Sequence, residues 1–233
     1  MNGKYQMKLV RFEEISSTND YVKEQKKQGE NLIVIAKRQT GGKGTKGRSF
    51  SSNEGGVYLT KLVFYKNFPA EKVFLVMART AVAVCKTLES FALKPVIKWA
   101  NDVFVNGRKI CGILIENSFT GKNISSSIIG VGLNVNNYLP DELSSIAISM
   151  REALGEKQDF DLVEKRLIEN LNEPYEMEEY RSRIGYLNKE ITLIENGVSV
   201  RVIPLSVGDD GALTVSVNGE IRKVFAGEVS LLV

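Results

Sequence analysis

The hydrophobic positions of this 233-residue chain follow two periods, and each period predicts a different kind of element. After Pro69, apolar residues recur at helical spacing from Phe74 to Phe91, which predicts one long helix that ends by Pro95. Strands are predicted from short apolar runs at 32–37, 57–65, 96–99, 103–105, 108–116 and 127–135. Because helices and strands are both present, we expect an α+β protein with a mixed β-sheet flanked by helices.

Local signals place several boundaries. The hydroxyl-rich stretch 16–19 precedes a helix predicted at 20–28, and Gly29 ends it. Asn106-Gly107 predicts a tight hairpin turn between two strands. A further capped helix is predicted from Asp161 to about Leu171.

Beyond about residue 186 the pattern changes to short β-rich runs separated by glycine turns. The runs are 190–194, 198–202, 213–217, 220–225 and 229–233. Their spacing predicts a small SH3-like β-barrel. We therefore expect a larger domain at 1–186 and a small C-terminal domain at 187–233.

Composition excludes several kinds of chemistry. The chain has no histidine, which rules out histidine triads, histidine zinc sites and imidazole bases. Lysine, arginine, backbone N–H groups and carboxylates, with Mg²⁺, must then carry any catalysis, and these groups suit phosphoryl and nucleotidyl transfer. A net charge of +3 is too small to indicate a nucleic-acid binder, so no nucleic-acid partner is expected.

The sequence also bears on location. No run of 18 apolar residues occurs and the first 30 residues are polar and charged, so no membrane association and no secretory signal are expected. Cys85 and Cys111 lie within apolar segments, as reduced buried cysteines of a cytoplasmic protein do.

The residues with the clearest chemical potential form the loop Gln39–Arg48, which follows a predicted strand. Four glycines and three cations fall within these ten residues. Glycines let backbone N–H groups approach a ligand and cations neutralise an anion, so the loop indicates a phosphate or carboxylate site. The alternative is a solvated basic surface loop.

Two nucleotide-binding signatures nearly fit this loop. Gly42, Gly44 and Gly47 spell the dinucleotide fingerprint, and Arg48-Ser49 stands where a P-loop has Lys-Ser/Thr. Both signatures need a helix directly after the loop, but residues 49–56 form helices poorly. We reject both.

Three more groups of residues are candidates for a site. One is the segment Lys98-Trp99-Ala100-Asn101-Asp102, which lies between two predicted strands and offers groups that could bind adenine, ribose or Mg²⁺. The alternative is that this segment is only a turn. Lys109 and Gly112 follow the hairpin, where the lysine either binds an anion or is exposed. Ser17-Thr18 caps a helix or binds a ligand.

Taken in order, these motifs resemble the biotin protein ligase family over essentially the whole chain. The motifs are Ser-Ser-Thr-Asn, Gln-Thr-Gly-Gly-Lys-Gly-Thr-Lys-Gly-Arg, Lys-Trp-Ala-Asn-Asp, Lys-Ile-Cys-Gly-Ile-Leu-Ile-Glu and Gly-Val-Gly-Leu-Asn-Val-Asn. The resemblance implies a class II synthetase-like catalytic domain. It also implies an enzyme that joins biotin to ATP, releases pyrophosphate and passes biotin to a lysine of a biotin carboxyl carrier protein. The family includes dimers, so a homodimer is compatible with it.

The resemblance also implies roles for individual residues. Lys109 and Arg48 would be catalytic, and Asp102 would hold Mg²⁺. Biotin would be bound by Ser17, Thr18, Gln39, Gly42, Lys43, Lys109 and Gly112. ATP would be bound by Lys43, Gly44, Thr45, Lys46, Gly47, Arg48, Phe50, Lys98, Trp99, Asn101, Asp102 and Asn134.

The chain departs from the family pattern at four positions. Lys43 and Thr45 replace two arginines of the loop, Phe50 replaces a tryptophan and Ala100 replaces a proline. Threonine removes a charge, and lysine lacks the fork of arginine. We expect looser retention of the biotinyl-adenylate, and in the extreme a ligase without activity.

Other readings remain open. A lipoate or octanoate ligase shares the catalytic fold, and a basic-loop nucleic-acid module with an SH3-like barrel belongs to a different class. Cys111 as an acyl-accepting nucleophile is disfavoured because no histidine could activate it. Since the cap motif starts at residue 16, no winged-helix domain and no repressor function are expected.

Overall fold

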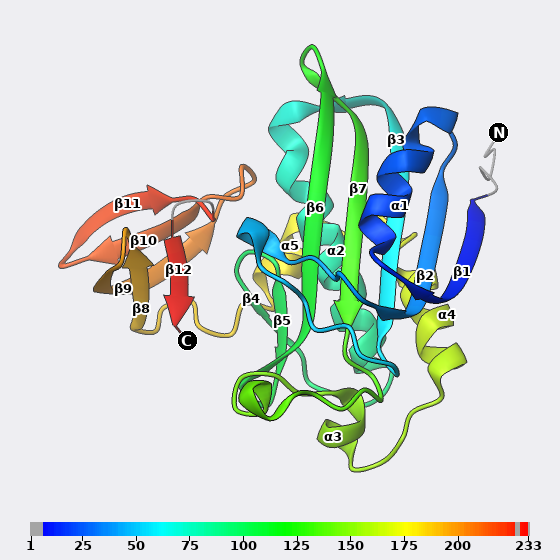
Figure 1. Ribbon diagram of the computed structural model, residues 1–233. Helices are drawn as coiled ribbons and strands as arrows, with labels where there is room; N and C mark the ends of the chain where they lie inside the picture. The colour runs from blue at the N-terminus through cyan, green and yellow to red at the C-terminus, as the bar shows by residue number, and fades with distance from the viewer. Residues whose placement is uncertain (1–6, 227–228, 233) are drawn as a thin grey trace.

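The computed structural model describes residues 7–226 and 229–232 and contains two β-sheets. The larger sheet has seven strands in the order β1-β2-β3-β7-β6-β5-β4 (Figure 1). Its strands are β1 (Lys8–Ile15), β2 (Leu32–Gln39), β3 (Val57–Pro69), β4 (Val96–Lys98), β5 (Asp102–Val105), β6 (Arg108–Thr120) and β7 (Asn123–Leu133). β1 and β2 are parallel and all other neighbours are antiparallel, so the sheet is mixed as predicted.

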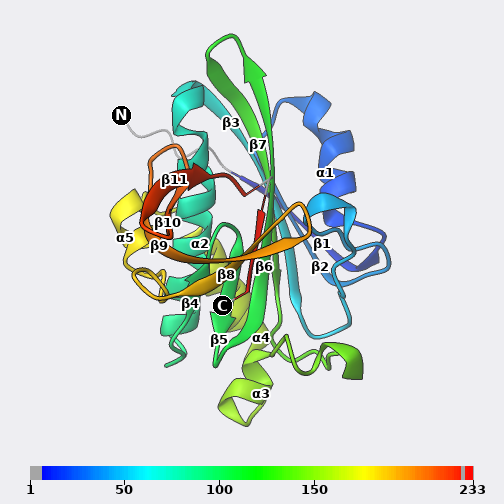
Figure 2. The same ribbon diagram turned by 90° about the vertical axis from the view of Figure 1, so that its left-hand side faces the viewer.

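Helices cover both faces of this sheet. Helix α1 (Thr18–Gln25) lies on one face and the long helix α2 (Val73–Glu89) on the other (Figure 2). Short helices complete the domain: α3 (Met150–Leu154), α4 (Phe160–Asn170) and α5 (Met177–Arg181), of which α4 and α5 contact α2. Single 3-10 turns occur at η1 (Lys26–Gln28), η2 (Thr45–Gly47), η3 (Ala70–Lys72) and η4 (Asp141–Leu143).

The two faces of β3 explain why each helix packs where it does. Leu59 faces the large core beneath α2, whereas Leu62 belongs to a smaller core beneath α1. Alternate strand residues point to opposite faces, so one strand serves both cores. The sheet is therefore buried on both sides at its centre.

Most predicted boundaries agree with the structure. The α1 helix is capped by the Ser17 side chain, and Asn106 and Gly107 adopt the positive φ values, 52° and 74°, that a tight hairpin requires. Helix α2 ends at Glu89, earlier than Pro95 suggested, because Ala92 turns into the left-handed region at φ 59°.

The strand β1 was not predicted. Its eight residues alternate poorly and are mostly exposed, since it forms the edge of the sheet and pairs only with β2. An edge strand rich in charge carries little of the apolar pattern on which strand prediction depends.

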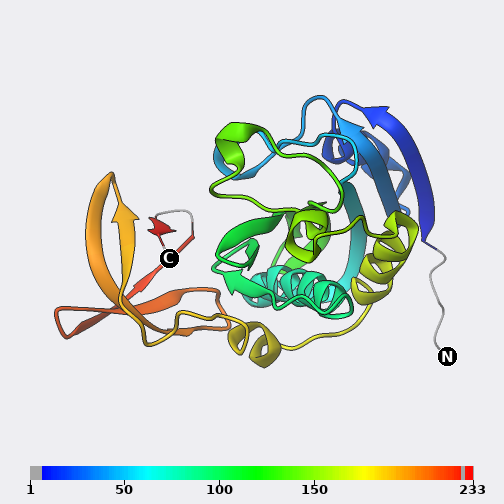
Figure 3. The same cartoon turned by 90° about the horizontal axis from the view of Figure 1, so that it is seen from below.

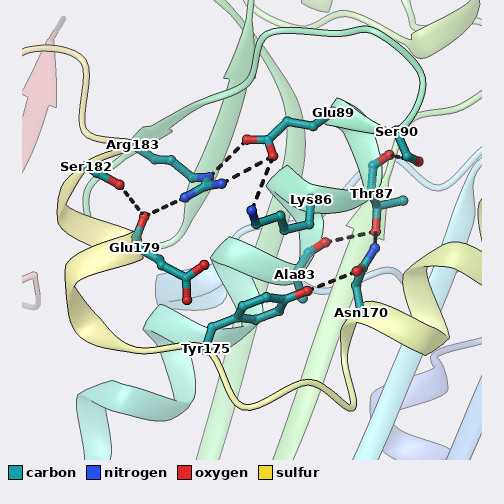
Figure 4. A network of polar contacts seen from close by, with 10 residues as sticks. All are labelled: Ala83, Lys86, Thr87, Glu89, Ser90, Asn170, Tyr175, Glu179, Ser182 and Arg183. Carbon is teal, nitrogen blue, oxygen red and sulfur yellow. Dashed lines mark hydrogen bonds and ion pairs between the residues drawn. The ribbon is translucent and has the colours of Figure 1, made fainter.

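A polar network holds α4 and α5 against α2 (Figure 4). Arg183, which follows α5, donates to both carboxylate oxygens of Glu89 at 3.1 and 3.2 Å. Asn170 at the end of α4 donates to the hydroxyl of Thr87 and accepts from the hydroxyl of Tyr175. The connection between α4 and α5 is thereby fixed at both ends.

The smaller sheet has five strands in the order β11-β10-β9-β8-β12, all antiparallel (Figures 1 and 3). The strands are β8 (Ile191–Glu195), β9 (Val198–Val207), β10 (Leu213–Val217), β11 (Glu220–Val224) and β12 (Val229–Leu232). This arrangement agrees with the predicted SH3-like unit. The Trp99 indole N–H donates to the carbonyl of Gly211 at 3.0 Å and joins the two sheets.

Within residues 7–226 and 229–232, none of the helices has the length and apolar character needed to cross a membrane.

Candidate active site

A pocket of about 480 Å³ opens on the face of the large sheet that carries α1. Its walls come from the start of α1, the end of β2 and the loop that follows it, the start of β3, the residue Asn101, and the strands β6 and β7. We call it the α1-side pocket.

The glycine loop folds over this pocket as a small irregular hairpin. Lys43 pairs with Ser49, and the N–H of Gly44 donates to the carbonyl of Arg48 at 2.7 Å. Lys46 and Gly47 reverse the chain at its tip, with φ 57° and 73°. The loop leads into β3, so the helix that both rejected nucleotide signatures require is not there.

A chain of hydrogen bonds crosses one end of the pocket. The Gln39 side-chain oxygen accepts from the backbone N–H of Thr18 at 2.8 Å and from its hydroxyl at 3.0 Å. The Gln39 amide nitrogen donates to the Ser52 hydroxyl at 3.0 Å, and Ser52 donates to the carbonyl of Phe50. The pocket thus has a rigid, uncharged polar end that ties α1 to the glycine loop.

Glycines form the floor of the pocket. Gly112 on β6 and Gly132 on β7 stand opposite each other, and the ring of Phe50 lies on the pair. A Cβ atom at Gly132 would fall 2.6 Å from a ring carbon of Phe50, and one at Gly112 would fall 3.0 Å from the ring. Farther along β7, a Cβ at Gly130 would fall 2.7 Å from the side-chain oxygen of Asn19. The absence of side chains at these three positions makes the room for Phe50 and Asn19.

The other end of the pocket is cationic. Lys109 lies 2.7 Å from the carboxylate of Asp102, and its ammonium is 5.8 Å from the centre of the Phe50 ring. Lys98 lies near the same pair. Burial, and to a smaller degree the charge of Lys109, lowers the pKa of Lys98, although Asp102 partly offsets this. Asp102 forms its ion pair with Lys109, while the Lys98 ammonium lies 5.1 Å from the centre of the Phe104 ring. This end therefore has two cations and one carboxylate, which leaves net positive charge for an anion.

Ten of the predicted site residues line the pocket. They are Ser17, Thr18, Gln39, Lys43, Gly44, Thr45, Phe50, Asn101, Lys109 and Gly112. Asp102 adjoins the pocket through its ion pair with Lys109. Lys98 does not line the pocket, and its ammonium lies over the ring of Phe104. Gly42 is buried in the base of the loop, where its carbonyl accepts from the N–H of Phe50.

The remaining predictions fall outside the pocket. Lys46, Gly47 and Arg48 are exposed at the tip of the glycine loop. Trp99 is 5% exposed, its peptide bond to Ala100 is cis, and its indole is bonded to Gly211. The geometry does not support the stacking of an adenine on Trp99, because the indole lies in the core that joins the two sheets.

Asn134 also lies apart from the pocket walls. It is 3% exposed, donates to the carbonyl of Ile148 and accepts from Asn137. The segment at Ile148 in turn pairs with the backbone of Lys109. In this arrangement Asn134 supports the strand that carries Lys109, and its assignment to ATP stays a prediction.

Eight lining residues were not among the predicted site residues: Asn19, Tyr58, Leu59, Ile113, Leu114, Gly130, Val131 and Gly132. Thr60, which contacts Thr18 and Asn19, was missed as well. Asn19 lines the pocket, and its side-chain nitrogen is buried without a hydrogen-bond partner. Thr60 on β3 is fully buried and hydrogen-bonds to Thr18 and Asn19. The Ser-Ser-Thr-Asn motif contains Asn19, but a cap motif does not indicate that its last residue faces a pocket, and Thr60 lies in an apolar strand with no signal of its own.

The acidic residues bear on the metal prediction. Among the residues that the structure describes, no group of three potential metal ligands occurs. Mg²⁺ in nucleotide sites is commonly held by one or two carboxylates together with substrate phosphates, and Asp102 can provide one. The donor set therefore fits a metal only as a companion of bound phosphates.

Both cysteines are free and buried. Burial raises the pKa of the Cys111 thiol far above its ordinary value and that of Cys85 to about 12. A thiol in that state is not a nucleophile, so Cys111 has a packing role, as the sequence indicated.

The sequence model of the biotin/lipoate A/B protein ligase family matches residues 11–134, which include the glycine loop, Lys109 and both floor glycines. The fold and the site thus define a protein of the ligase class, and the chain belongs to the biotin/lipoate A/B protein ligase family.

Individual relatives narrow the comparison. The bifunctional ligase/repressor BirA of Bacillus subtilis is 33% identical over 219 residues, which cover 87% of this chain and 66% of BirA. The chain thus spans just under two thirds of that relative. The biotin–[acetyl-CoA-carboxylase] ligase of Mycobacterium tuberculosis is 26% identical, with 86% of this chain and 79% of the relative covered.

A solved structure is similar over nearly the whole chain. The Aquifex aeolicus biotin protein ligase, in complex with biotin and ATP, has a TM-score of 0.79 and 28% identity. The match covers 97% of this chain and 98% of the other. Both sheets are therefore part of the similarity.

Proposed function

We propose that this protein is a biotin protein ligase. In the first step, a carboxylate oxygen of biotin attacks the α-phosphorus of ATP, and pyrophosphate leaves as biotinyl-5′-AMP forms. In the second step, the amine of an acceptor lysine attacks the acyl carbon, AMP leaves, and the lysine loses a proton as the amide forms. The acceptor is a biotin carboxyl carrier protein.

One observation carries this proposal. A single pocket joins a neutral hydrogen-bonding end at Thr18 and Gln39 to a cationic end at Lys109, and between them it is lined by the Phe50 ring and by glycines of β6 and β7. A ligand with a polar uncharged head, a slim aliphatic chain and a carboxylate has the same order of chemistry. Biotin is such a ligand. The Aquifex aeolicus biotin protein ligase, solved with biotin and ATP, shares the fold of this chain.

The residues divide into three functions. Ser17, Thr18, Gln39 and Asn19 provide donors and acceptors for the ureido head. Lys109 neutralises the carboxylate and the α-phosphate in turn, which stabilises the charge that develops on the attacked phosphorus. The glycine loop brings its N–H groups, Lys43 and the exposed Arg48 toward the phosphates, and holding both reactants in line lowers the barrier by roughly 7–11 kcal/mol in favourable cases.

Mg²⁺ is proposed as a cofactor beside ATP. Asp102 would hold it together with the phosphates, and the ion would supply neutralisation of the pyrophosphate leaving group. The side-chain amide of Asn101 donates to the carbonyl of Ile113, and the backbone carbonyl of Asn101 accepts from the N–H of Ile113. These bonds to β6 would hold Asn101 in a fixed position beside the nucleotide.

Three further assignments belong to the proposal. The catalytic domain ends near residue 186 and the SH3-like domain follows. The protein acts in the cytoplasm, where its two free cysteines stay reduced. It acts without a nucleic-acid partner, and a homodimer is compatible with its family.

The test is pyrophosphate exchange into ATP with Mg²⁺ and one acid at a time. Exchange with biotin but not with lipoate or octanoate supports the proposal. A second candidate function, lipoate or octanoate ligation, is favoured by the family model, which covers both kinds of ligase. Exchange with lipoate or octanoate alone would establish that candidate instead, and no exchange with any of the three would overturn both.

A further inference from the structure

A buried lysine lies on the opposite face of the sheet from the proposed active site. Lys61 is the residue after Thr60 on β3, so its side chain points away from the α1-side pocket and toward α2. It stands opposite Ile129 of β7 and is 6% exposed. A lysine this deeply buried is uncommon unless a partner compensates its charge.

The partners of Lys61 are neutral. Its ammonium donates to the carbonyl of Leu171 at 2.6 Å and to the side-chain oxygen of Asn172 at 2.9 Å. Leu171 is the C-cap of α4, whose partial negative charge offsets part of the cost of burial. No ion pair of Lys61 occurs among the described residues, and burial lowers the pKa of Lys61 to about 8. Among the described residues these two bonds use two of the three ammonium donors of Lys61.

Lys61 lines a second pocket, of about 690 Å³ and open to solvent. We call it the α2-side pocket. Its walls are mostly apolar and come from β3, β7, α2 and the connection between α4 and α5, including Val63, Phe68, Val76, Ile129 and Leu171. A second cation, Arg79 of α2, also lines it and is paired with Glu176.

The walls of the α2-side pocket are held in place. Arg79 donates to the carbonyl of Tyr175 at 2.8 Å, and the Tyr175 hydroxyl donates to Asn170 at 2.9 Å. Asn170 is bonded to Thr87 of α2 (Figure 4). The connection between α4 and α5 is therefore anchored to α2 on both sides of the pocket, which makes the pocket a preformed feature of the fold.

We propose that the α2-side pocket binds a small organic monoanion, whose carboxylate pairs with Lys61 and whose apolar body packs between β3 and α2. An apolar cavity lined by a buried lysine that has no ion pair among the described residues is suited to such an amphiphilic acid, because the ion pair removes the uncompensated charge and the walls bury the hydrocarbon. The alternative is that Lys61 only caps α4, a role that requires no ligand in the pocket. This inference stands independently of the function proposed for the α1-side pocket.

The test is a calorimetric titration of the full chain with phenylacetate and, separately, with the neutral phenylacetamide, with biotin present throughout at saturating concentration. The wild type is expected to prefer the acid by at least about tenfold, since hydrogen bonds between charged groups are among the stronger ones. The Lys61→Met variant is expected to lose this preference. The Lys72→Met variant, which removes an exposed cation, is expected to keep it.

Three results would each overturn the proposal. The wild type could bind acid and amide equally well, Lys61→Met could keep the wild-type preference for the acid, or phenylacetate could fail to bind. If Lys61→Met does not fold, the wild type still provides a test. Its affinity for phenylacetate is expected to fall as the pH rises through about 8, where Lys61 loses its proton. The other ionisable groups that line the pocket are Tyr65, whose pKa burial raises, Arg79 and Glu173. An ordinary arginine or carboxylate does not change charge near that pH, so a constant affinity would also overturn the proposal.

Discussion

Lys109 and Asp102 form an ion pair of 2.7 Å between adjacent strands, with 31% and 24% of their side chains exposed. Asp102 opposes Gly112 in that pairing, so the ion pair closes over a position without a side chain. The lysine is thereby held at the wall of the pocket. An anion that enters the pocket meets a cation already in position.

This arrangement makes Lys109 the first residue to change. Lys109→Gln is expected to reduce biotin-dependent pyrophosphate exchange by about a hundredfold to a thousandfold, the typical cost of removing one preorganised group that stabilises transition-state charge. The matched control is Lys94→Gln, an exposed cation away from the pocket. If the exchange rates of Lys109→Gln and of the wild type lay within about twofold of each other, the role of Lys109 in charge stabilisation would be contradicted.

The glycine floor predicts a steric effect. Gly132→Ala places a Cβ 2.6 Å from the ring of Phe50, so the ring must move and the glycine loop with it. We expect the KM for biotin to rise by about tenfold or more, with a smaller change in kcat.

A second variant tests whether the effect of Gly132→Ala is steric. If the collision with the ring is the cause, the double variant Gly132→Ala with Phe50→Leu should recover part of the loss. A double-mutant cycle of steady-state kinetics measures this coupling. Strictly additive effects would show that Phe50 is not the residue displaced.

The Gln39 network predicts a joint effect on stability and binding. Gln39→Ala leaves the buried N–H and hydroxyl of Thr18 without their acceptor. We expect a loss of about 1–3 kcal/mol in the free energy of unfolding, together with weaker biotin binding. Urea unfolding and calorimetric titration measure the two, with the exposed Gln28→Ala as control. Unchanged stability would mean that the Thr18 groups find other partners.

Thr45 predicts how firmly an adenylate is held. It lines the pocket at a position where the family pattern has a cation. Thr45→Arg is expected to reduce release of biotinyl-AMP and the labelling of unrelated lysines, because a bidentate cation is restored beside the phosphate. Thr40→Arg, before the glycines, is the control. A wild-type protein that releases no adenylate in a trapping assay would refute the idea of a loose loop.

Lys61 predicts a dependence of stability on pH. Its pKa is about 8 in the folded protein against an ordinary 10.5, so between these values the folded state binds fewer protons than the unfolded state. The free energy of unfolding of the wild type must then rise with pH relative to Lys61→Met, by up to about 3 kcal/mol. Urea unfolding of both proteins from below pH 8 to about pH 10 tests this, and a constant difference would contradict it.

Many local features could be predicted because they depend on neighbouring residues. The cap at Ser17, the turn at Asn106-Gly107 and the helical repeat of α2 are each encoded within a few positions. The glycine loop was assigned to an anion site from its residues alone, and Lys43, Gly44 and Thr45 do line the pocket. Such features can be predicted because local sterics and hydrogen bonds determine the backbone conformation there.

Long-range contacts could not be predicted in the same way. The sequence offers no means of knowing that Phe50 rests on two glycines from different strands, or that Trp99 faces Gly211 in the other sheet. The charged edge strand β1 was missed because pairing with β2, not its own pattern, makes it a strand.

Residue order alone therefore established most of the elements, the chemistry of the glycine loop and, through its motifs, the family. The three-dimensional arrangement was needed to bring Lys109 beside Asp102 and Gln39 beside Thr18. It was also needed to direct Thr60 toward Thr18 and Asn19 on one face of the sheet and Lys61 toward the α2-side pocket on the other. The reason is that register and side-chain direction in a sheet depend on partners far away in the chain, and a strand exposes adjacent residues to opposite faces whatever their identity.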